Sequence, residues 1–196
     1  MPLVSIRKKI RDEKVIDFRS KNKRHFIELQ EKDSEMKIGN VFNVFFLSNP
    51  LYRGMFELFI LIGTGICGLV FSWTGFSIFP ISNILGGILI FLAFAFHLWT
   101  EKDHKQAHEH SENIEKIVNT GVYAKIRHPL YLSLILQNIG IALAFGVMIT
   151  FLMALLTMIH WIVTALKEEN MLLQKFPNEY MQYKQKVRWR MIPGIF

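Results

Sequence analysis

Apolar residues gather in four long segments, 55–74, 78–99, 130–145 and 147–166, which polar or glycine-containing stretches separate. The first, second and fourth segments are long enough to cross the hydrocarbon core of a membrane as helices, which takes about 20 residues. The third is shorter, so we expect its start to be buried among the other helices rather than exposed to lipid. Only Gly146 and its neighbours separate the last two segments, which predicts a tight helical hairpin. The pattern therefore predicts an all-α fold, a polytopic bundle of about four transmembrane helices.

The polar residues at the two ends of the chain predict two further parts. Residues 1–53 are basic with scattered apolar positions, which predicts an amphipathic or interfacial N-terminal segment. Within it, Leu3, Ile6 and Ile10 share a helical face, which fits a short helix on the membrane surface, and a disordered basic tail fits residues 19–37 about equally well. Residues 54–196 predict a transmembrane core, and its end, 167–196, mixes charged and aromatic residues. We expect that end to fold back over the spans as a cap.

Charge sets the expected orientation. The net charge is +7, and all 23 Lys and Arg residues fall before the first span, between the second and third spans, or after the fourth. With four spans these three segments share one side of the membrane, which the positive-inside rule makes cytoplasmic. We therefore expect an integral, multi-pass protein with cytoplasmic N- and C-termini. Its basic residues suit a negative membrane face, and they lack the aromatic platform that nucleic-acid binding would use.

The most distinctive polar stretch is the central block, residues 121–131, which lies directly before the third apolar segment. Gly121 permits a tight turn or a close approach of the backbone to a ligand. Pro129 fixes its own φ angle and biases the preceding residue away from the helical region. We therefore expect a helix to begin at or after Pro129.

Two interpretations of the central block remain open. Arg127, His128 and Tyr131 would gather at the start of this helix, where backbone N–H groups and the helix dipole favour an anion. This arrangement suits a small zwitterionic or anionic ligand. Alternatively, Arg127 and His128 anchor a transmembrane helix to lipid headgroups, and Tyr123 and Tyr131 are interfacial aromatic residues.

Other ionisable residues lie in or beside the apolar segments. Glu168 and Glu169 follow the fourth segment and point about 100° apart on a helix, so one could face a site while the other faces water. Carboxylates at a helix C-terminus oppose the dipole, which favours a functional role for one of them. We expect Glu57, near the start of the first span, to reach the headgroups or the helix N-terminus. His97 and His160 are interpreted as packing or hydrogen-bonding residues.

Metal and disulfide chemistry find little support in the sequence. The single Cys67 excludes a disulfide scaffold and a cysteine-based metal site. His104 and His108 could share a helix face, with His110 nearby, but no His-Glu-x-x-His motif accompanies them. We interpret this stretch as a solvated polar loop and predict no metal.

Two blocks of residues resemble a known family. The central block reads Gly121-Val-Tyr123-Ala-Lys-Ile-Arg127-His128-Pro129-Leu-Tyr131, and after the hairpin comes Glu168-Glu169-x-x-Leu172-x-x-x-Phe176-x-x-x-Tyr180-x-x-Tyr183, ending in Arg190-x-x-Pro193. Together they resemble the signature of the integral-membrane methyltransferases, the isoprenylcysteine carboxyl methyltransferase and phospholipid methyltransferase group. The resemblance covers residues 115–193.

This resemblance implies a bundle of transmembrane helices with an S-adenosylmethionine pocket on the cytoplasmic side. It implies that His128, Tyr131 and one of Glu168 or Glu169 hold the amino-acid and ribose portions of the cofactor. The expected cofactor-binding residues are Val118, Gly121, Tyr123, His128, Pro129, Tyr131 and Glu168, with Val118, Gly121 and Tyr123 on the adenine side. The expected catalytic residues are Arg127, Glu168 and Glu169.

The methyl acceptor implied by the resemblance is lipid-soluble or lipid-attached and enters from the bilayer. It is a carboxylate, as in isoprenylcysteine, or an amine, as in phosphatidylethanolamine. Two positions depart from the family pattern: Thr164 stands where an Arg often precedes the Glu pair by four residues, and Glu115 stands where a His is common. An Arg near the acceptor would suit a carboxylate, so Thr164 weakens the case for prenylcysteine itself.

Two other functions compete with methyl transfer. The run Val187–Phe196 is also similar to the ends of membrane sterol reductases, which use NADPH. A non-catalytic membrane adaptor that kept the fold is the other alternative. The ligand separates the three: S-adenosylmethionine, a nicotinamide, or neither.

Overall fold

The computed structural model describes residues 46, 48–75, 78, 80–103 and 114–195. The N-terminal segment 1–40 and the histidines 104, 108 and 110 lie outside these residues. The helices are α2 (Pro50–Val70), α3 (Ile81–Asp103), the short 3₁₀ helix η2 (Gly121–Ala124), α4 (Pro129–Phe145), α5 (Met148–Lys175) and α6 (Pro177–Lys186).

Local sequence explains the α4–α5 hairpin. Pro129 is the first residue of α4, where its missing N–H costs no hydrogen bond. At the other end Gly146 takes the left-handed conformation, with φ of 66°, and closes the helix through its N–H to the Ala142 carbonyl. Helix α5 begins at Met148, so the predicted tight hairpin is confirmed.

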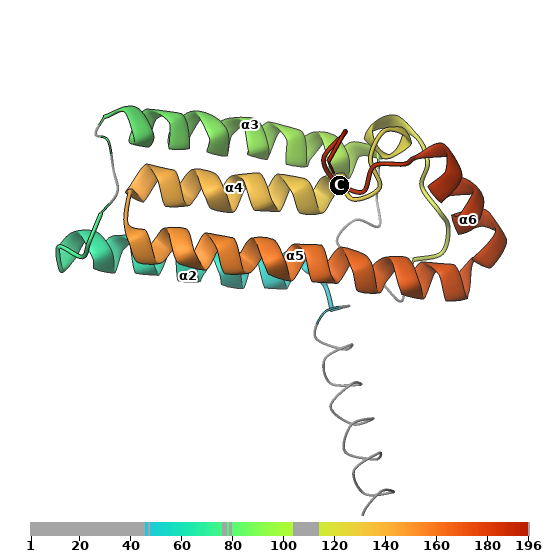
Figure 1. Ribbon diagram of the computed structural model, residues 1–196, viewed down its shortest axis with the longest axis horizontal. Helices are drawn as coiled ribbons and strands as arrows, with labels where there is room; N and C mark the ends of the chain where they lie inside the picture. Colours follow the sequence, from blue (N-terminus) through green and yellow to red (C-terminus); the bar gives the residue numbers. More distant parts are fainter. Residues whose placement is uncertain (1–45, 47, 76–77, 79, 104–113, 196) are drawn as a thin grey trace, which may run out of the picture. The chain divides into compact units, whose positions relative to one another are not determined.

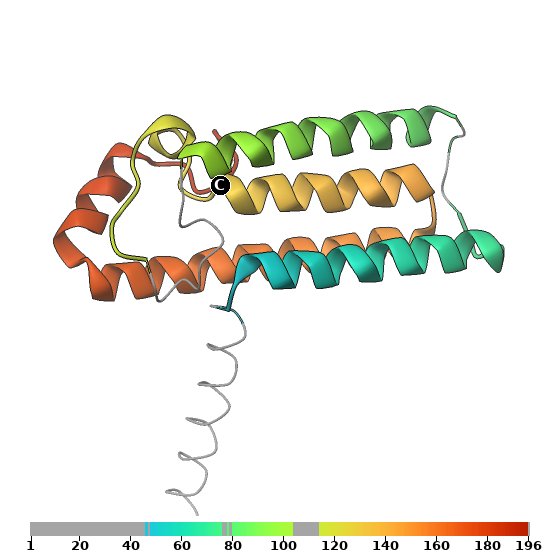
Figure 2. The ribbon, with the colours of Figure 1, turned by 180° about the vertical axis from the view of Figure 1, so that it is seen from behind.

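Helix α4 lies between α3 on one side and α2 and α5 on the other (Figures 1 and 2). Helices α3 and α4 approach each other closely at Gly86 and Gly140. A Cβ atom on Gly86 would lie 2.4 Å from the backbone nitrogen of Ala144, so only glycine fits there. Because α4 is packed on three sides, its 17 residues include nine that are buried.

In the described part of the chain, three helices, α2, α3 and α5, are long and apolar enough to cross a membrane, and α4 is a shorter apolar helix beside them. The predicted all-α bundle of about four spans is thus confirmed, as is the burial of the start of the third apolar segment. Several bounds were wrong. Helix α2 covers Pro50–Val70 instead of 55–74, α3 covers Ile81–Asp103 instead of 78–99, and α5 continues past residue 166 to Lys175.

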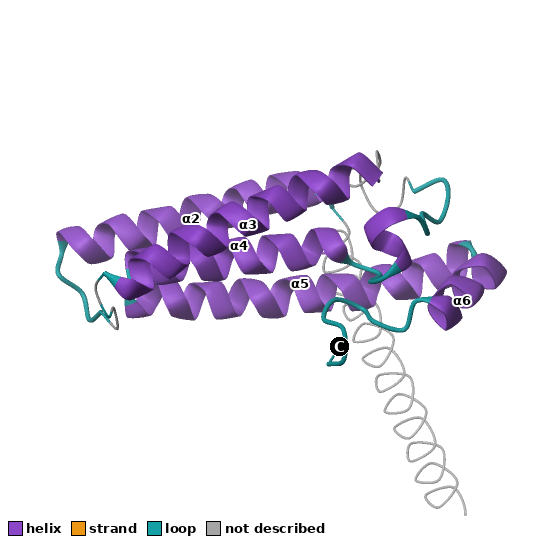
Figure 3. Cartoon of the chain, turned by 90° about the horizontal axis from the view of Figure 1, so that it is seen from above, coloured by secondary structure: helices purple, strands orange, loops and turns teal. Residues whose placement is uncertain are grey.

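The chain folds back after α5, as Figure 3 shows from above. It turns at Phe176 into α6, and the segment after α6 then runs beside the central block, where Trp189 pairs with Ile126 in a parallel bridge. Helix α6 thus lies beside the end of α5, where a cap was expected. It packs on a small core made of Ile114, Leu172, Tyr180, Tyr183 and Val187.

Candidate active site

The start of α4 and the late turns of α5 bring three predicted site residues together. The Tyr131 hydroxyl donates a 2.6 Å hydrogen bond to Oε2 of Glu168. The His128 ring stacks on Tyr131 with centroids 5.4 Å apart, and its Nδ1 lies 3.6 Å from the same oxygen. All three are buried, with exposed fractions of 6% for His128, 4% for Tyr131 and 8% for Glu168.

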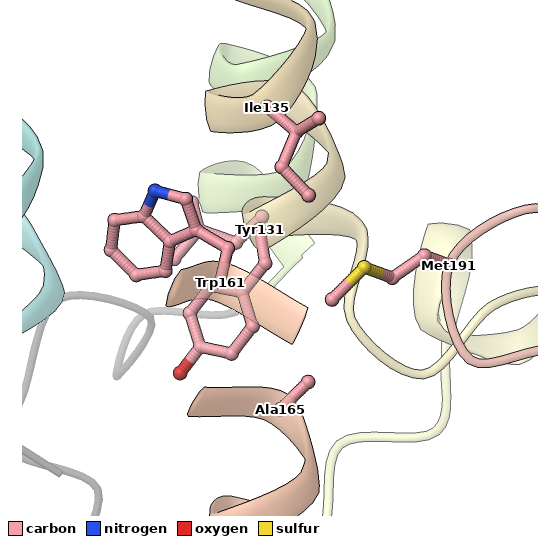
Figure 4. Packing of buried hydrophobic residues seen from close by; sticks show 6 residues of the cluster. Tyr131, Ile135, Trp161, Ala165 and Met191 are labelled. Atoms are coloured by element: carbon pink, nitrogen blue, oxygen red, sulfur yellow. The ribbon is translucent and has the colours of Figure 1, made fainter. Parts of the chain in front are cut away.

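An aromatic stack continues from this group toward the interior. Tyr131 stacks on Trp161 of α5 at 5.0 Å, and Met191 of the C-terminal segment packs in the same cluster (Figure 4). The Tyr131 ring stacks on both His128 and Trp161, which limits the freedom of the phenol to leave Glu168.

Glu169 has very different surroundings. Its Oε1 accepts hydrogen bonds from Nε of Arg127 and Nε of Arg190, both at 2.9 Å, and Nη2 of Arg190 donates to Oε2 at 3.1 Å. Lys184 Nζ lies 3.8 Å from Oε2, and Nε2 of His128 lies 3.3 Å from Oε1. This carboxylate therefore joins α5, the central block and the C-terminal segment.

The sequence argument about the acidic pair was partly wrong. Because α5 runs on to Lys175, Glu168 and Glu169 lie within the helix, and the opposing-dipole argument does not apply to them. Neither faces water, since both are buried. The expectation that they lie beside Arg127 and His128 agrees with the geometry, which joins the two blocks that are far apart in sequence.

Backbone hydrogen bonds hold the C-terminal segment against the central block. The N–H groups of Arg127 and His128 donate to the carbonyls of Trp189 and Arg190 at 3.0 and 2.8 Å. Nη1 of Arg127 also donates to the carbonyls of Val187 and Arg188 at 3.0 and 3.2 Å. The guanidinium of Arg127 is therefore already engaged by Glu169 and by the tail.

The residues expected on the adenine side lie just before the central helix. Gly121 has a φ of 57°, the left-handed conformation that the turn requires of it. Tyr123 is buried, and its carbonyl accepts a 2.8 Å hydrogen bond from the Tyr183 hydroxyl of α6. Val118 is half-buried in the segment between residue 114 and η2.

The two tyrosines of α6 have perturbed acidity. Burial raises the pKa of Tyr180, and the nearby carboxylates of Glu169 and Glu168 raise it further. Burial also raises the pKa of Tyr183, although the Arg127 guanidinium opposes the shift. Both phenols therefore stay protonated wherever the protein is folded near neutral pH.

A second buried polar group was missed from sequence. Glu57 does not reach the headgroups: it is buried, and its Oε2 accepts hydrogen bonds from Nε1 of Trp161 and Nδ2 of Asn138. Arg53, counted with the basic N-terminal flank, is buried in the first turn of α2. His160 lies between these two residues as a hydrogen-bonding residue, as expected. The available signal was the pair of opposite charges, Arg53 and Glu57, four residues apart where the first apolar segment begins.

A cavity of about 160 Å³ lies among α2, α3 and α4. It is lined mainly by apolar residues, with His97, Gln137 and Asn138 as polar groups. Asn138 connects this cavity to Glu57 through the hydrogen bond described above.

Comparison with known families decides the relationship. The family model for phospholipid methyltransferases matches residues 81–179, about half of the chain, from the start of α3 into α6. The chain belongs to the phospholipid methyltransferase family. The match includes the central block and the Glu168–Glu169 pair, so the expected resemblance is confirmed. No curated protein sequence matches the chain. Family membership and three apolar helices together indicate an integral-membrane protein of a methyltransferase family.

Proposed function

We propose that this protein is an S-adenosylmethionine-dependent membrane methyltransferase that acts on a lipid-soluble or lipid-attached acceptor. The observation that carries the proposal is the buried group of His128, Tyr131 and Glu168 at one end of the α4–α5 hairpin, inside the region that the family model matches. A carboxylate, a phenol and an imidazole in such a position are groups that bind a small zwitterion.

The donor set fits the proposed cofactor. Oε2 of Glu168 is engaged by Tyr131, whereas Oε1 accepts no hydrogen bond from any described residue and could bind an ammonium or a ribose hydroxyl. His128 and the start of α4 suit the carboxylate of the cofactor. Pro129 sets the start of that helix, and Val118, Gly121 and Tyr123 are proposed to line the adenine side.

The acidic pair divides into two roles in this proposal. Glu169, held by Arg127 and Arg190, positions the central block and the C-terminal segment. Glu168 has only the Tyr131 hydroxyl as a hydrogen-bond donor among described residues and is proposed to contact the ligand. Arg127 is therefore proposed as a positioning residue rather than as a group that touches the cofactor.

When bound, the cofactor supplies an electrophilic methyl group on a positively charged sulfur, which becomes a neutral thioether once the methyl group is transferred. The protein aligns the acceptor and excludes water from the buried site. A carboxylate acceptor needs no base, whereas an amine acceptor must lose a proton. Glu168 and His128 are the candidate bases, because Glu169 is already paired with cations.

The apolar cavity among α2, α3 and α4 supports an acceptor that carries a hydrocarbon chain. We propose that it receives part of that chain from the bilayer. The positive-inside distribution of charge further supports a cytoplasmic site, with both termini on that side.

The test is calorimetric binding of S-adenosylhomocysteine to detergent-purified protein, with NADPH as the parallel ligand. We expect saturable binding that His128→Ala removes and that Glu168→Gln weakens by about tenfold or more, or about 1.4 kcal/mol. Glu179→Gln, an exposed carboxylate of α6, is the matched control and should bind like the parent protein. Binding of NADPH alone would assign the protein to the reductases, and binding of neither by folded protein would favour the adaptor.

A further inference from the structure

Arg53 is a buried cation whose place in the fold the proposed function does not use. It lies in the first turn of α2 with an exposed fraction of 6%. Its Nη1 donates hydrogen bonds to Oγ1 of Thr164 at 2.9 Å and to Nε2 of His160 at 3.0 Å. The guanidinium also lies over the ring of Trp161, 4.9 Å from the centroid.

The guanidinium also interacts with the Tyr131 side chain, but two of its nitrogens lack a hydrogen-bond acceptor in the described part of the chain. Its Nε and Nη2 are buried and have no hydrogen-bond partner among the residues that the structure describes. No described carboxylate lies within ion-pair distance of it, although Glu57 and Glu168 interact with it over a longer range. A buried charge with unsatisfied donors is costly in a membrane helix, so an additional anionic partner is expected to complete it.

A network of hydrogen bonds holds Arg53 in place. Glu57 is fixed by Trp161 Nε1 at 2.7 Å and Asn138 Nδ2 at 3.1 Å, and its Oε1 lies 3.0 Å from Nδ1 of His160. Because a guanidinium can only donate, Nε2 of His160 accepts from Arg53, and the proton of its neutral ring is assigned to Nδ1. Such a network orients the guanidinium and leaves its Nε and Nη2 without an acceptor among the described residues.

The position of Arg53 connects it to the proposed cofactor site. Its partner Thr164 lies one helical turn before Glu168 on α5, so the two residues share a face of that helix. Tyr131, which donates to Glu168, also interacts electrostatically with Arg53. The guanidinium thus lies beside the cofactor-binding group, on the side toward the interior of the span.

We propose that Arg53 binds an anionic oxygen group of the methyl acceptor, a carboxylate or a phosphate, and that Glu57 and His160 position it. This inference rests on the proposed function and names the chemistry of its acceptor. Thr164 occupies the position where an Arg was expected from the family pattern, and Arg53 hydrogen-bonds to that Thr164. The cation is therefore supplied from α2, which lies outside the residues that the family model matches.

Acceptor binding by protein saturated with S-adenosylhomocysteine tests the proposal. Three probes are titrated by calorimetry: N-acetyl-S-farnesylcysteine for a carboxylate, phosphatidylethanolamine for a phosphate, and a long-chain alkylamine that carries no anion. At least one anionic probe should bind, and Arg53→Gln should weaken it by about 10- to 100-fold, the range expected for loss of charge-assisted hydrogen bonds. Comparison of the two anionic probes shows whether the group that Arg53 binds is a carboxylate or a phosphate.

The variants separate recognition from folding. Arg53→Lys should retain part of the affinity, and methylguanidinium should restore part of it to Arg53→Ala. Glu57→Gln should weaken the same probe by a smaller factor, because it disturbs only the positioning of Arg53. Arg188→Gln removes an exposed cation and should leave the affinity for the anionic probe unchanged. In each variant the affinity for S-adenosylhomocysteine should stay within about twofold of the parent, which would show an intact site.

Three results would overturn this inference. They are failure of both anionic probes to bind, equal binding of the alkylamine and the anionic probes, and an anionic probe that Arg53→Gln does not weaken. If a variant also fails to bind S-adenosylhomocysteine, its site is disturbed, and the role of Arg53 is then decided by the affinity of Arg53→Lys and by the methylguanidinium rescue. Absence of S-adenosylhomocysteine binding by the parent protein would instead contradict the proposed function, so the two failures are distinguishable.

Discussion

Glu168 and Glu169 are adjacent in sequence, and at the residue scale their surroundings differ sharply. Glu169 contacts the guanidinium groups of Arg127 and Arg190 together with Lys184. Among the residues that the structure describes, only Tyr131 donates a hydrogen bond to Glu168. Because a buried carboxylate that is fully paired has little capacity left for a ligand, the difference favours Glu168 as the ligand-binding member of the pair.

The Tyr131 hydroxyl provides a test of this assignment. Tyr131→Phe removes the 2.6 Å hydrogen bond to Glu168 but keeps the ring between His128 and Trp161. Loss of a hydrogen bond to a charged group costs about 1.5–3 kcal/mol, so we expect affinity for S-adenosylhomocysteine to fall by about 10- to 100-fold. Calorimetry measures the change directly.

Tyr52→Phe is the matched control, since the Tyr52 side chain is 72% exposed. It should leave the affinity unchanged. Equal affinities for Tyr131→Phe and the parent protein would remove the Tyr131–Glu168 pair from the proposed binding site.

At the scale of elements, α5 continues beyond its apolar segment and carries the acidic pair with it. No Pro or Gly occurs from Lys167 to Phe176, and good helix formers such as Leu172 and Lys175 allow the helix to extend until Pro177 begins α6. The hydropathy pattern marks where the apolar part ends, but hydrogen bonding decides where the helix ends. This explains why the predicted end at residue 166 was too early.

The contact between α3 and α4 makes a prediction about stability. A Cβ atom on Gly86 would lie 2.4 Å from Ala144 N and 2.7 Å from Gly140 O, whereas one on Gly87 would meet nothing within 4 Å. Gly86→Ala should therefore destabilise the protein by about 1–3 kcal/mol through overpacking. Gly87→Ala should change stability by less than about 1 kcal/mol, in the stabilising direction. Thermal unfolding in detergent compares them, and equal melting temperatures would contradict the close contact.

Helix α6 makes a prediction about alkaline pH. Burial raises the pKa of Tyr180 and Tyr183, so the folded protein holds their protons more tightly than the unfolded chain does. Their contribution to stability is fully present below the unfolded pKa of about 10 and falls as the pH rises above it. Folded protein should show at least two phenols, those of Tyr180 and Tyr183, that ionise at higher pH than the phenols of denatured protein, measured by ultraviolet absorbance. In Tyr180→Phe, the absorbance change at high pH should be smaller by the contribution of one phenol.

At the scale of the whole molecule, the α2–α3 and α4–α5 connections meet at one end of the helices. The N–H of Met148 donates to the carbonyl of Thr74 at 3.0 Å, and Gly75 pairs with Val147. The central block, the acidic pair and α6 are at the other end of α4 and α5 (Figure 1). If α4 crosses with its three longer neighbours, the basic flanks share the side that carries the candidate site.

This orientation can be tested with single cysteines in a Cys67→Ala background. Lys186→Cys lies at the end that carries the candidate site and Thr74→Cys at the opposite end, and both positions are exposed. A membrane-impermeant maleimide should label Thr74→Cys in intact cells and Lys186→Cys only in inside-out vesicles, as the positive-inside rule predicts. The reverse pattern would invert the proposed topology, and labelling of both positions from one side would contradict the number of spans.

Sequence alone determined the fold class, the hairpin at Gly146, the start of α4 at Pro129 and the two blocks that carry the family resemblance. These features depend on local rules: hydropathy over a span, the fixed φ of proline and the left-handed conformation of glycine. Two features were decided only by the tertiary structure. Of the adjacent pair, Glu169 is the carboxylate that is paired with arginines, and Arg53 lies beside Thr164. Both depend on which side chains from distant segments meet in a buried space, because the cost of burying a charge is set by its partners and not by its neighbours in the chain.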